Sequence, residues 1–314
     1  MKSSDSISLG PGAEFDIVRR MLARWGSLAK GIGDDAVVLP GAPGRMVVST
    51  DASVEDVHFR RDWMSHAEIG YRATAAALSD LAAMGAEPVG VLLALTLPER
   101  DVARVEEIAD GIGDCVGSCG TVVLGGDVTR GEKLALAVTV LGTAQEPLLR
   151  SAARPGDRVY VTGRLGGASA ALRELQAGRE PAGKSRARFV RPVPRLRESR
   201  WLADHGCTAA IDISDGLVGD ARHIAAASGV AVHLRQESVP VFDGATGRDA
   251  VAGGEEYELL VTCAGPLDVA AFEKRFGVPL TEIGGVAAGE PDAILTNDGT
   301  RVAAPAGYDH FSAS

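Results

Sequence analysis

Seven aspartates stand at the ends of apolar runs or beside glycine, and their spacing favours a metal-dependent phosphate site. They are Asp34, Asp35, Asp51, Asp80, Asp127, Asp212 and Asp215. Crowded carboxylates repel one another unless cations neutralise them, and Mg²⁺ takes oxygen ligands that it shares with substrate phosphates and water. A single aspartate of this kind would only cap a helix or fill a turn. The whole set predicts a magnesium-dependent nucleotide site.

Two of these segments carry additional polar groups. The segment Gly125-Gly126-Asp127 follows an apolar run, and its glycines would let the backbone approach a phosphate beside a metal-binding carboxylate. The segment 212–216 (Asp-Ile-Ser-Asp-Gly) combines two carboxylates and a hydroxyl at an expected strand-to-helix turn. Ser214 or Asp215 would also serve as an ordinary cap of the helix that follows. Both segments are expected to form turns at strand ends.

A third segment matches a well-known phosphate-binding pattern but lies in the wrong context. Residues 178–185 read Gly-Arg-Glu-Pro-Ala-Gly-Lys-Ser, which fits G-x-x-x-x-G-K-[ST]. A genuine phosphate loop follows a strand and opens a helix. This segment instead follows the helix-like run 168–176 and continues into Pro192 and Pro194. We therefore interpret it as a basic surface connector.

Length and composition bound the class of protein. A chain of 314 residues with 46% hydrophobic content is long enough for two cores, and we expect domains at 1–150 and 151–314. The net charge of −10 argues against a nucleic-acid surface, and no apolar run approaches the ~20 residues that span a bilayer. The four cysteines lack zinc-ligand spacing. We expect a cytoplasmic protein with no membrane partner.

The hydrophobic periodicity predicts helices and strands in alternation, which is typical of an α/β fold. Helices are expected over residues 14–25, 66–84, 99–116 and 167–175, and another begins after Gly216. Strands are expected over residues 36–39, 46–50, 89–97, 121–124, 134–141, 158–162 and 257–263.

Seven short motifs occur in an order that resembles the thiamine-monophosphate kinase family of the aminoimidazole-ribonucleotide-synthetase-like superfamily. They are Gly31-Ile-Gly-Asp-Asp-Ala36, Ser49-Thr-Asp51 with Val57-His-Phe59, Leu78-Ser-Asp-Leu-Ala-Ala-Met-Gly-Ala86, Gly125-Gly-Asp127 with Thr129-Arg-Gly131, Asp212-Ile-Ser-Asp-Gly-Leu217, Gly253-Gly-Glu255 with Tyr257-Glu-Leu259, and Gly307-Tyr-Asp-His-Phe311. Each motif alone is short, but seven in the family's order are specific, and they span nearly the whole chain.

The resemblance implies an activity and an architecture. The family transfers the γ-phosphoryl group of ATP directly onto thiamine monophosphate, giving thiamine diphosphate and ADP. Its fold, α/β (α+β), has an N-terminal α/β domain whose strands join those of a partner in a dimeric barrel, and a C-terminal α/β domain beside it. We therefore expect a thiamine-phosphate kinase that acts as a homodimer with ATP and several Mg²⁺ ions.

The resemblance also assigns roles to individual residues, but no general base among them. Metal ligands would be Asp35, Ser49, Thr50, Asp51, Asp80, Asp127, Asp212 and Asp215. ATP contacts would be Gly126, Asp127, Arg150 and Ser214. Contacts with the thiamine compound would be His58, Glu255 and Tyr308, with the tyrosine ring stacking on a flat heterocycle.

The chain departs from the family pattern at three positions, and other functions remain open. Asp56 stands where the family has glycine, Ala77 where it has asparagine, and Glu256 where it has aspartate. The alternatives are another ATP-dependent superfamily member, such as selenophosphate synthetase, aminoimidazole ribonucleotide synthetase or the hydrogenase maturation factor, or a non-catalytic sensor of nucleotide or thiamine diphosphate. No cysteine precedes Cys115 and none ends the chain, which disfavours the first and last of these enzymes.

Overall fold

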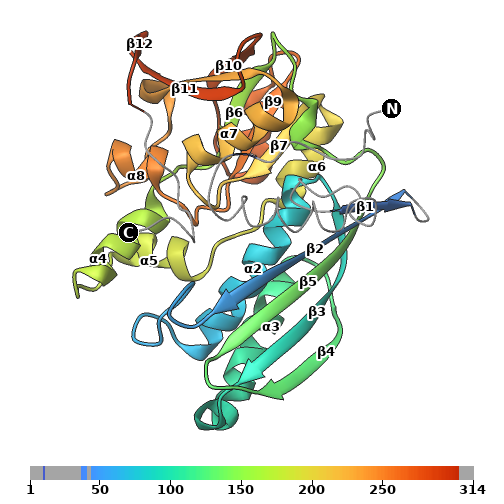
Figure 1. Cartoon of the computed structure of the whole chain (residues 1–314), viewed down its shortest axis with the longest axis vertical. Coiled ribbons are helices and arrows are strands. Elements are labelled where there is room, and N and C mark those ends of the chain that lie inside the picture. Colours follow the sequence, from blue (N-terminus) through green and yellow to red (C-terminus); the bar gives the residue numbers. More distant parts are fainter. Residues whose placement is uncertain (1–9, 11–36, 41–43, 304–314) are drawn as a thin grey trace.

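The computed structural model describes residues 10, 37–40 and 44–303 of the chain. These residues form two β-sheets, one in each half of the chain, with helices packed against both (Figure 1). The expected α/β class is therefore confirmed. The predicted helix over 14–25 and the turn over 31–35 lie outside the described residues.

The first sheet has five strands in the order β1-β2-β5-β3-β4. These are β1 (Val37–Pro40), β2 (Arg45–Val54), β5 (Ala135–Ala144), β3 (Glu87–Leu97) and β4 (Val123–Arg130). Only the β3–β4 pair is parallel, and its crossover contains a 3₁₀ turn (Glu99–Arg104) and helix α3 (Val105–Ser118). Helices α2 (His66–Ala83) and α3 cover one face of this sheet (Figure 1).

Helix α2 is buried almost all the way round. It begins with a capping box in which Ser65 and Glu68 bond each other's backbone N–H groups. Every residue from 69 to 79 is buried, as expected for an alanine-rich helix between packed layers. Glycines let α2 and α3 cross closely, because a Cβ at Gly70 or Gly111 would collide with the carbonyl oxygen of Ile108 or Ala67. The expected helix over 66–84 is confirmed.

The second sheet has seven strands in the order β12-β11-β8-β10-β6-β9-β7. They are β6 (Arg158–Thr162), β7 (Cys207–Asp212), β8 (Ala231–Arg235), β9 (Leu259–Cys263), β10 (Leu280–Ala287), β11 (Asp292–Asn297) and β12 (Thr300–Arg301). The helices are α4 (Gly167–Gln176), α5 (Gly183–Val190), α6 (Leu196–Asp204), α7 (Leu217–Ser228), α8 (Gly247–Ala252) and α9 (Val269–Phe276), with 3₁₀ turns at Arg150–Ala152 and Gln236–Ser238. Only β8 and β11 pair in parallel.

Two hydrophobic cores lie within this framework. One lies within the second half of the chain, among residues such as Val159, Ile211 and Ile224. The other begins under the first sheet and continues through α2 into α5, α6 and one face of the second sheet, so it includes Phe189 and Trp201. The two halves therefore share a core. None of the described helices is long and apolar enough to cross a lipid bilayer.

Two local predictions differ from the structure. Gly125, Gly126 and Asp127 lie inside β4 instead of forming a turn after it, because their backbone pairs in register with β3. The predicted connector over 178–185 contains the start of α5, with Lys184 in the first turn of this helix. Residues 178–185 follow a helix, α4, as expected, and this context differs from that of a genuine phosphate loop, which follows a strand.

A buried ionic group anchors the edge of α5 and α6 to the second sheet. The Glu258 carboxylate accepts hydrogen bonds from Arg195 Nε (2.8 Å) and Nη2 (2.6 Å), from Arg188 Nη2 (2.7 Å) and from Thr162 Oγ1 (2.7 Å). Burial acts to raise the pKa of Glu258, but the charges of Arg195 and Arg188 outweigh it and lower the pKa to about 2. The buried group is therefore stable only while the negative charge of Glu258 and the positive charges of the arginines are both present.

We expect Glu258→Gln to lower the free energy of unfolding by about 3 kcal/mol, because it leaves buried guanidinium groups without their counter-charge. Because the folded pKa is lowered, the difference from the parent should be full above pH 4.5 and shrink as the pH falls toward 2. Urea denaturation measures the loss of unfolding free energy and its dependence on pH. Glu174→Gln, which breaks an exposed pair with Arg179, is the control and should cost under about 1 kcal/mol. Equal losses in the two variants would contradict the role of the buried group.

Candidate functional site

The first half of the chain brings several predicted metal ligands together at β2 and α2. Ser49, Thr50 and Asp51 lie on β2, and Asp80 lies near the end of α2. The Ser49 hydroxyl donates a hydrogen bond to Asp80 Oδ2 at 2.5 Å. Thr50 Oγ1 accepts a hydrogen bond from Thr139 of β5 at 3.0 Å. The helix therefore presents a carboxylate to the polar side chains of the strand.

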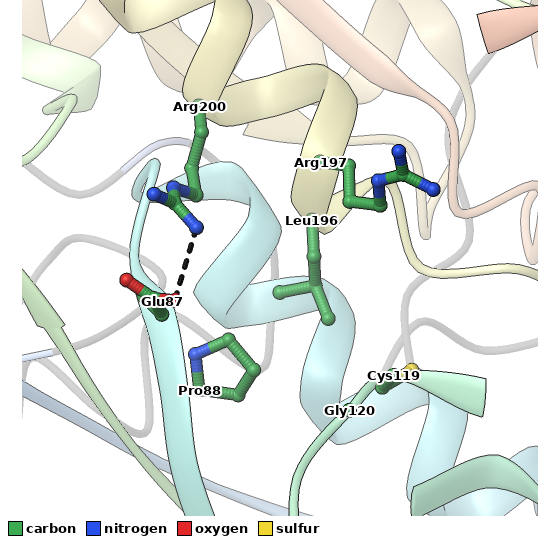
Figure 2. A pocket seen from close by; sticks show the side chains of 7 residues that line it. All are labelled: Glu87, Pro88, Cys119, Gly120, Leu196, Arg197 and Arg200. Carbon is green, nitrogen blue, oxygen red and sulfur yellow. Dashed lines mark ion pairs between the residues drawn. The ribbon is translucent and has the colours of Figure 1, made fainter. Parts of the chain in front are cut away.

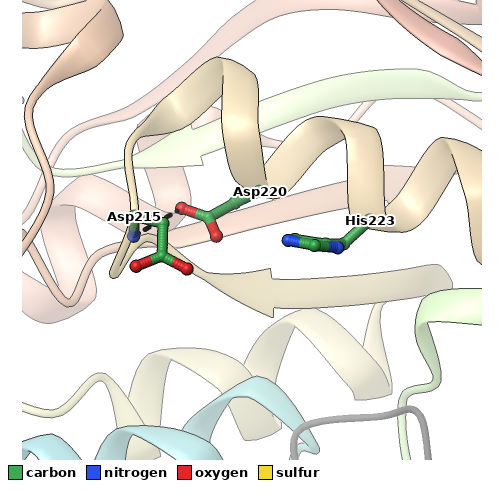
Figure 3. A group of neighbouring side chains, drawn as sticks. All are labelled: Asp215, Asp220 and His223. Atoms are coloured by element: carbon green, nitrogen blue, oxygen red, sulfur yellow. Dashed lines mark hydrogen bonds between the residues drawn. The ribbon is translucent and has the colours of Figure 1, made fainter. Parts of the chain in front are cut away.

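The second half contributes the turn between β7 and α7. Asp212 ends β7, Ser214 and Asp215 form the turn, and Gly216 is the N-cap residue of α7. The N-cap residue is therefore neither Ser214 nor Asp215, so the interpretation of one of them as the ordinary N-cap is wrong. The cap comes from within the helix, because Asp220 Oδ2 accepts hydrogen bonds from the N–H groups of Asp215 (3.2 Å) and Gly216 (3.1 Å) (Figure 3).

Asp220 is a buried acid beside this turn that sequence reasoning missed. Its side chain is 1% exposed, and with Asp215 and His223 it forms a group of possible ligand atoms within 4.8 Å of one another (Figure 3). Burial raises the pKa of Asp220 well above its ordinary value, and the charges of Asp215 and Asp212 raise it further, while Arg150 opposes them. Arg150, a predicted ATP contact, therefore lies close to this turn. Its carbonyl oxygen also accepts a hydrogen bond from Ser228.

The two groups of acids meet at Tyr257. Burial raises the pKa of the Tyr257 hydroxyl well above its ordinary value, and Arg72 lowers it, while Asp51, Asp212 and Asp215 raise it further. Because charges act on a buried group over short distances, Asp51 of the first half and the acids of the second half lie near the same tyrosine. The fold thus gathers acids from β2 and the β7–α7 turn, although they are far apart in the sequence.

The segment before β9 holds Glu255 in a strained backbone conformation. Glu255 (φ 65°) and Tyr257 (φ 52°) are both in the left-handed region, which non-glycine residues rarely adopt. Hydrogen bonds hold the segment on the acidic turn: Glu255 N–H donates to Ser214 O at 2.7 Å, and Tyr257 N–H donates to Ile213 O at 2.9 Å. A Cβ at Gly254 would collide with the Ser214 carbonyl oxygen. The segment therefore packs directly on the predicted ATP turn.

His58 is tied into its own loop. Its Nδ1 accepts a hydrogen bond from the N–H of Val54 at 3.1 Å, so this nitrogen carries no proton in that arrangement. Its carbonyl oxygen accepts a hydrogen bond from Arg72 Nη1 at 2.8 Å. Arg72 also forms an ion pair with Glu255. His58 and Glu255, two of the predicted substrate contacts, therefore lie near each other, because Arg72 contacts both of them.

Gly126 and Asp127 lie apart from these groups within one chain. The strand register places Asp51 opposite Val138, Val138 opposite Leu93, and Leu93 opposite Gly126. Three strand spacings separate Asp51 from Gly126, which corresponds to about 14 Å. The remaining two predicted site residues, Asp35 and Tyr308, lie outside the described residues.

The donor set near β2, α2 and the β7–α7 turn fits a small hard cation. Its ligand atoms are carboxylate and hydroxyl oxygens, from Ser49, Asp51, Asp80, Asp212 and Asp215. Burial raises the pKa of the neighbouring Asp220 and the charges of Asp215 and Asp212 raise it further, and a bound cation would relieve this charge repulsion. Such a set suits Mg²⁺ better than zinc, which prefers nitrogen and sulfur ligands.

A hollow lies away from these residues, between the start of β3, the end of α3 and the start of α6 (Figure 2). Arg200 spans it to form an ion pair with Glu87 at 3.1 Å. Cys119, Leu196 and Arg197 also line it. None of the predicted site residues is among its lining residues, so it is separate from the acidic site.

Comparison with known proteins identifies the family. Sequence models of AIR synthase related proteins match the chain twice, with the N-terminal domain at residues 33–144 and the C-terminal domain at residues 154–295. The thiamine-monophosphate kinase of Salmonella typhimurium is 38% identical and aligns with 95% of this chain and 98% of its own length. The chain belongs to the thiamine-monophosphate kinase family. The relative from Methanopyrus kandleri is 40% identical and aligns with 88% of this chain and 89% of its own.

Solved structures of this kinase family share the fold throughout the chain. A structure described as AaThiL complexed with AMPPCP and TMP has a TM-score of 0.84 and 30% identity, and the match covers 96% of this chain and 97% of that one. The thiamine-monophosphate kinase from Stenotrophomonas maltophilia has a TM-score of 0.76 and 36% identity, covering 94% and 99%. The hydrogenase maturation protein HypE matches with a TM-score of 0.72 at 18% identity, which shows a shared fold alone.

The family departure at Asp56 lies in a backbone conformation that suits glycine. Asp56 has φ 67°, and its exposed side chain pairs with Lys133 at 3.1 Å. Glycine adopts this conformation without steric cost, and an exposed ion pair contributes little. We expect Asp56→Gly to keep kinase activity and to leave the free energy of unfolding within about 1 kcal/mol of the parent. Thermal denaturation and a turnover assay measure these two quantities. A collapse of activity would show that Asp56 has acquired a role of its own.

Proposed function

We propose that this protein transfers the γ-phosphoryl group of ATP to thiamine monophosphate, giving thiamine diphosphate and ADP. The observation that carries the proposal is the near full-length match to thiamine-monophosphate kinases. The structural match at a TM-score of 0.84 supports it, because the two ligands of that protein correspond to an analogue of ATP and to the monophosphate. We place the reaction in the cytoplasm.

The chemistry requires charge neutralisation and alignment more than a strong base. The acceptor is a phosphate monoester, whose oxygens are nucleophilic at neutral pH, so no protein general base is needed. Mg²⁺ bound at the acidic site would neutralise phosphate charge. The chain would hold those ions with Asp35, Ser49, Thr50, Asp51, Asp80, Asp127, Asp212 and Asp215.

The remaining predicted residues would orient the two substrates. Ser214 lies in the β7–α7 turn and Arg150, in the 3₁₀ turn 150–152, lies close to it; both would contact ATP together with Gly126 and Asp127. His58 and Glu255 are linked through Arg72, and with Tyr308 they would contact the thiamine compound. The nucleotide would therefore be contacted from both halves of the chain, and the thiamine end would lie at the junction of the two halves. We propose a domain boundary at residue 150, with the ATP- and Mg²⁺-binding, dimer-forming domain before it and the second α/β domain after it.

A homodimer would cover the open edge of the first sheet. β4 is an outermost strand, all of its residues are exposed, and Val123, Leu124 and Val128 present apolar side chains to solvent. An exposed apolar edge strand invites pairing with another chain. Dimerisation through this edge would also bring a second chain to Gly126 and Asp127, which lie about 14 Å from Asp51 within one chain.

Purified protein incubated with ATP, Mg²⁺ and thiamine monophosphate should form thiamine diphosphate and ADP in equal amounts. Chromatography of the products measures both. Asp51→Asn should lower kcat on the order of 100-fold or more without unfolding the protein, because one charge of the metal site is lost. Lys184→Ala is the control and should change little.

Product from thiamine, selenide or an aminoimidazole precursor in place of the monophosphate would move the assignment to another superfamily activity. Tight binding of both ligands without release of ADP would favour a sensor. A large loss of ATP affinity in Lys184→Ala would restore the phosphate-loop interpretation of residues 178–185.

We expect Val128→Asp to convert a dimer of the parent protein into monomers, because it places a charge on the apolar edge of β4. Val128 is 63% exposed in the single chain. Light scattering during size-exclusion chromatography gives the mass. Val269→Asp, at an exposed valine on α9, is the matched control and should leave the mass unchanged. A monomeric parent would rule out the proposed dimer.

A further inference from the structure

Arg72 is a charged residue in the middle of an apolar, buried helix. Its neighbours on α2 include Tyr71, Ala73 and a run of alanines, and the residue itself is only 4% exposed. Removing a guanidinium from water costs several kcal/mol unless its hydrogen bonds and charge are matched inside the protein. A helix that only had to fill the core would place an apolar residue here. The contacts of Arg72 therefore indicate the role of its buried charge.

These contacts lead to the thiamine end of the proposed site. One terminal nitrogen donates a hydrogen bond to the carbonyl oxygen of His58, and the other forms an ion pair with Glu255. The guanidinium lies over the ring of Phe189 from α5, 4.5 Å from its centre. It also interacts with the charge of Asp51. Arg72 thus contacts two segments from opposite halves of the chain, and both carry a predicted substrate contact.

Both segments need outside support to keep their shape. The loop that carries His58 includes Asp56 in the left-handed region, and Glu255 is itself in that region. Such conformations cost free energy and persist only where surrounding contacts hold them. The planar guanidinium can bond a carbonyl oxygen and a carboxylate at the same time in a fixed geometry. Arg72 is therefore suited to fix the distance between the His58 loop and Glu255.

We propose that Arg72 is a positioning residue for thiamine monophosphate, which holds the His58 loop and the Glu255 carboxylate in the arrangement that receives the substrate. This inference rests on the proposed kinase function. It assigns no contact between Arg72 and either substrate, because Arg72 acts through His58 and Glu255.

The proposal predicts an effect confined to one substrate. The ATP turn is held by other groups, since Asp220 accepts the N–H groups of Asp215 and Gly216, and Ser214 O accepts the backbone N–H of Glu255. None of these bonds uses the Arg72 guanidinium. Loss of Arg72 should therefore disturb binding of thiamine monophosphate and leave binding of ATP nearly unchanged.

The test is a comparison of KM values in Arg72→Met, Arg72→Lys and a control, with Mg²⁺ saturating. We expect Arg72→Met to raise KM for thiamine monophosphate about 10- to 100-fold, because small misplacements of orienting groups are costly, and to change KM for ATP less than about threefold. Arg72→Lys keeps the charge but not the fork of donors, so it should recover part of the loss.

Arg191→Met is the matched control, because it removes an arginine that lies over the ring of Tyr71, the residue next to Arg72, and pairs with exposed Asp114. It should change neither KM value. Circular dichroism and thermal denaturation establish that each variant is folded. If Arg72→Met does not fold, the KM values of Arg72→Lys decide the question.

A second measurement asks whether Arg72 acts through Glu255. In the double variant Arg72→Met with Glu255→Gln, the rise in KM for thiamine monophosphate should be smaller than the product of the two single effects, because both changes break the same pair. Multiplicative effects would overturn the inference.

Equal changes in the two KM values, or a loss of thermal stability with both KM values unchanged, would also overturn it. These outcomes are distinct from failure of the proposed function, in which the parent protein itself forms no thiamine diphosphate.

Discussion

The burial of α2 between the two sheets is the constraint on which the site depends. Its residues from 69 to 79 are all buried, so its position is set by packing on every side. Asp80 and Arg72 lie eight residues apart on this helix, which corresponds to about 12 Å along its axis. One contacts Ser49 at the acidic site, and the other contacts His58 and Glu255. A single rigid element therefore fixes the spacing between the two ends of the site.

The sequence predicts most of the framework because the apolar runs have the period of their elements. The strand over 158–162 begins and ends as expected, and α2 and α4 differ from their predicted bounds by one residue. The glycine-containing segment of β4 was misplaced because two glycines and an aspartate are typical of a turn, whereas pairing with β3 keeps them extended. Tertiary pairing outweighed local preference there.

The candidate site was predictable only where its residues belong to local motifs. Asp220 could have been noticed, because it lies one helical turn beyond Gly216 and so can reach back to the start of α7. Arg72 also left a signal, as a lone charge within an apolar helix. The proximity of Asp51 to Asp212 and Asp215 has no signal in the sequence, since it depends on how the two halves of the chain pack together. The strain at Glu255 and Tyr257 was equally hidden, because backbone angles of this kind come from the bonds to residues 213 and 214.

The strand order of the first sheet has a consequence for how the chain is made. β5 is the central strand, and it is the last of the five in the sequence. Until residues 135–144 leave the ribosome, β1 and β2 have no partner to join them to β3 and β4. Until then β1–β2 and β3–β4 form two separate half-sheets with open edges, and such edges are prone to pair with other chains. Insertion of β5 covers the inner edges of both half-sheets at once, so the five-stranded sheet of the first half is completed in one late step of synthesis.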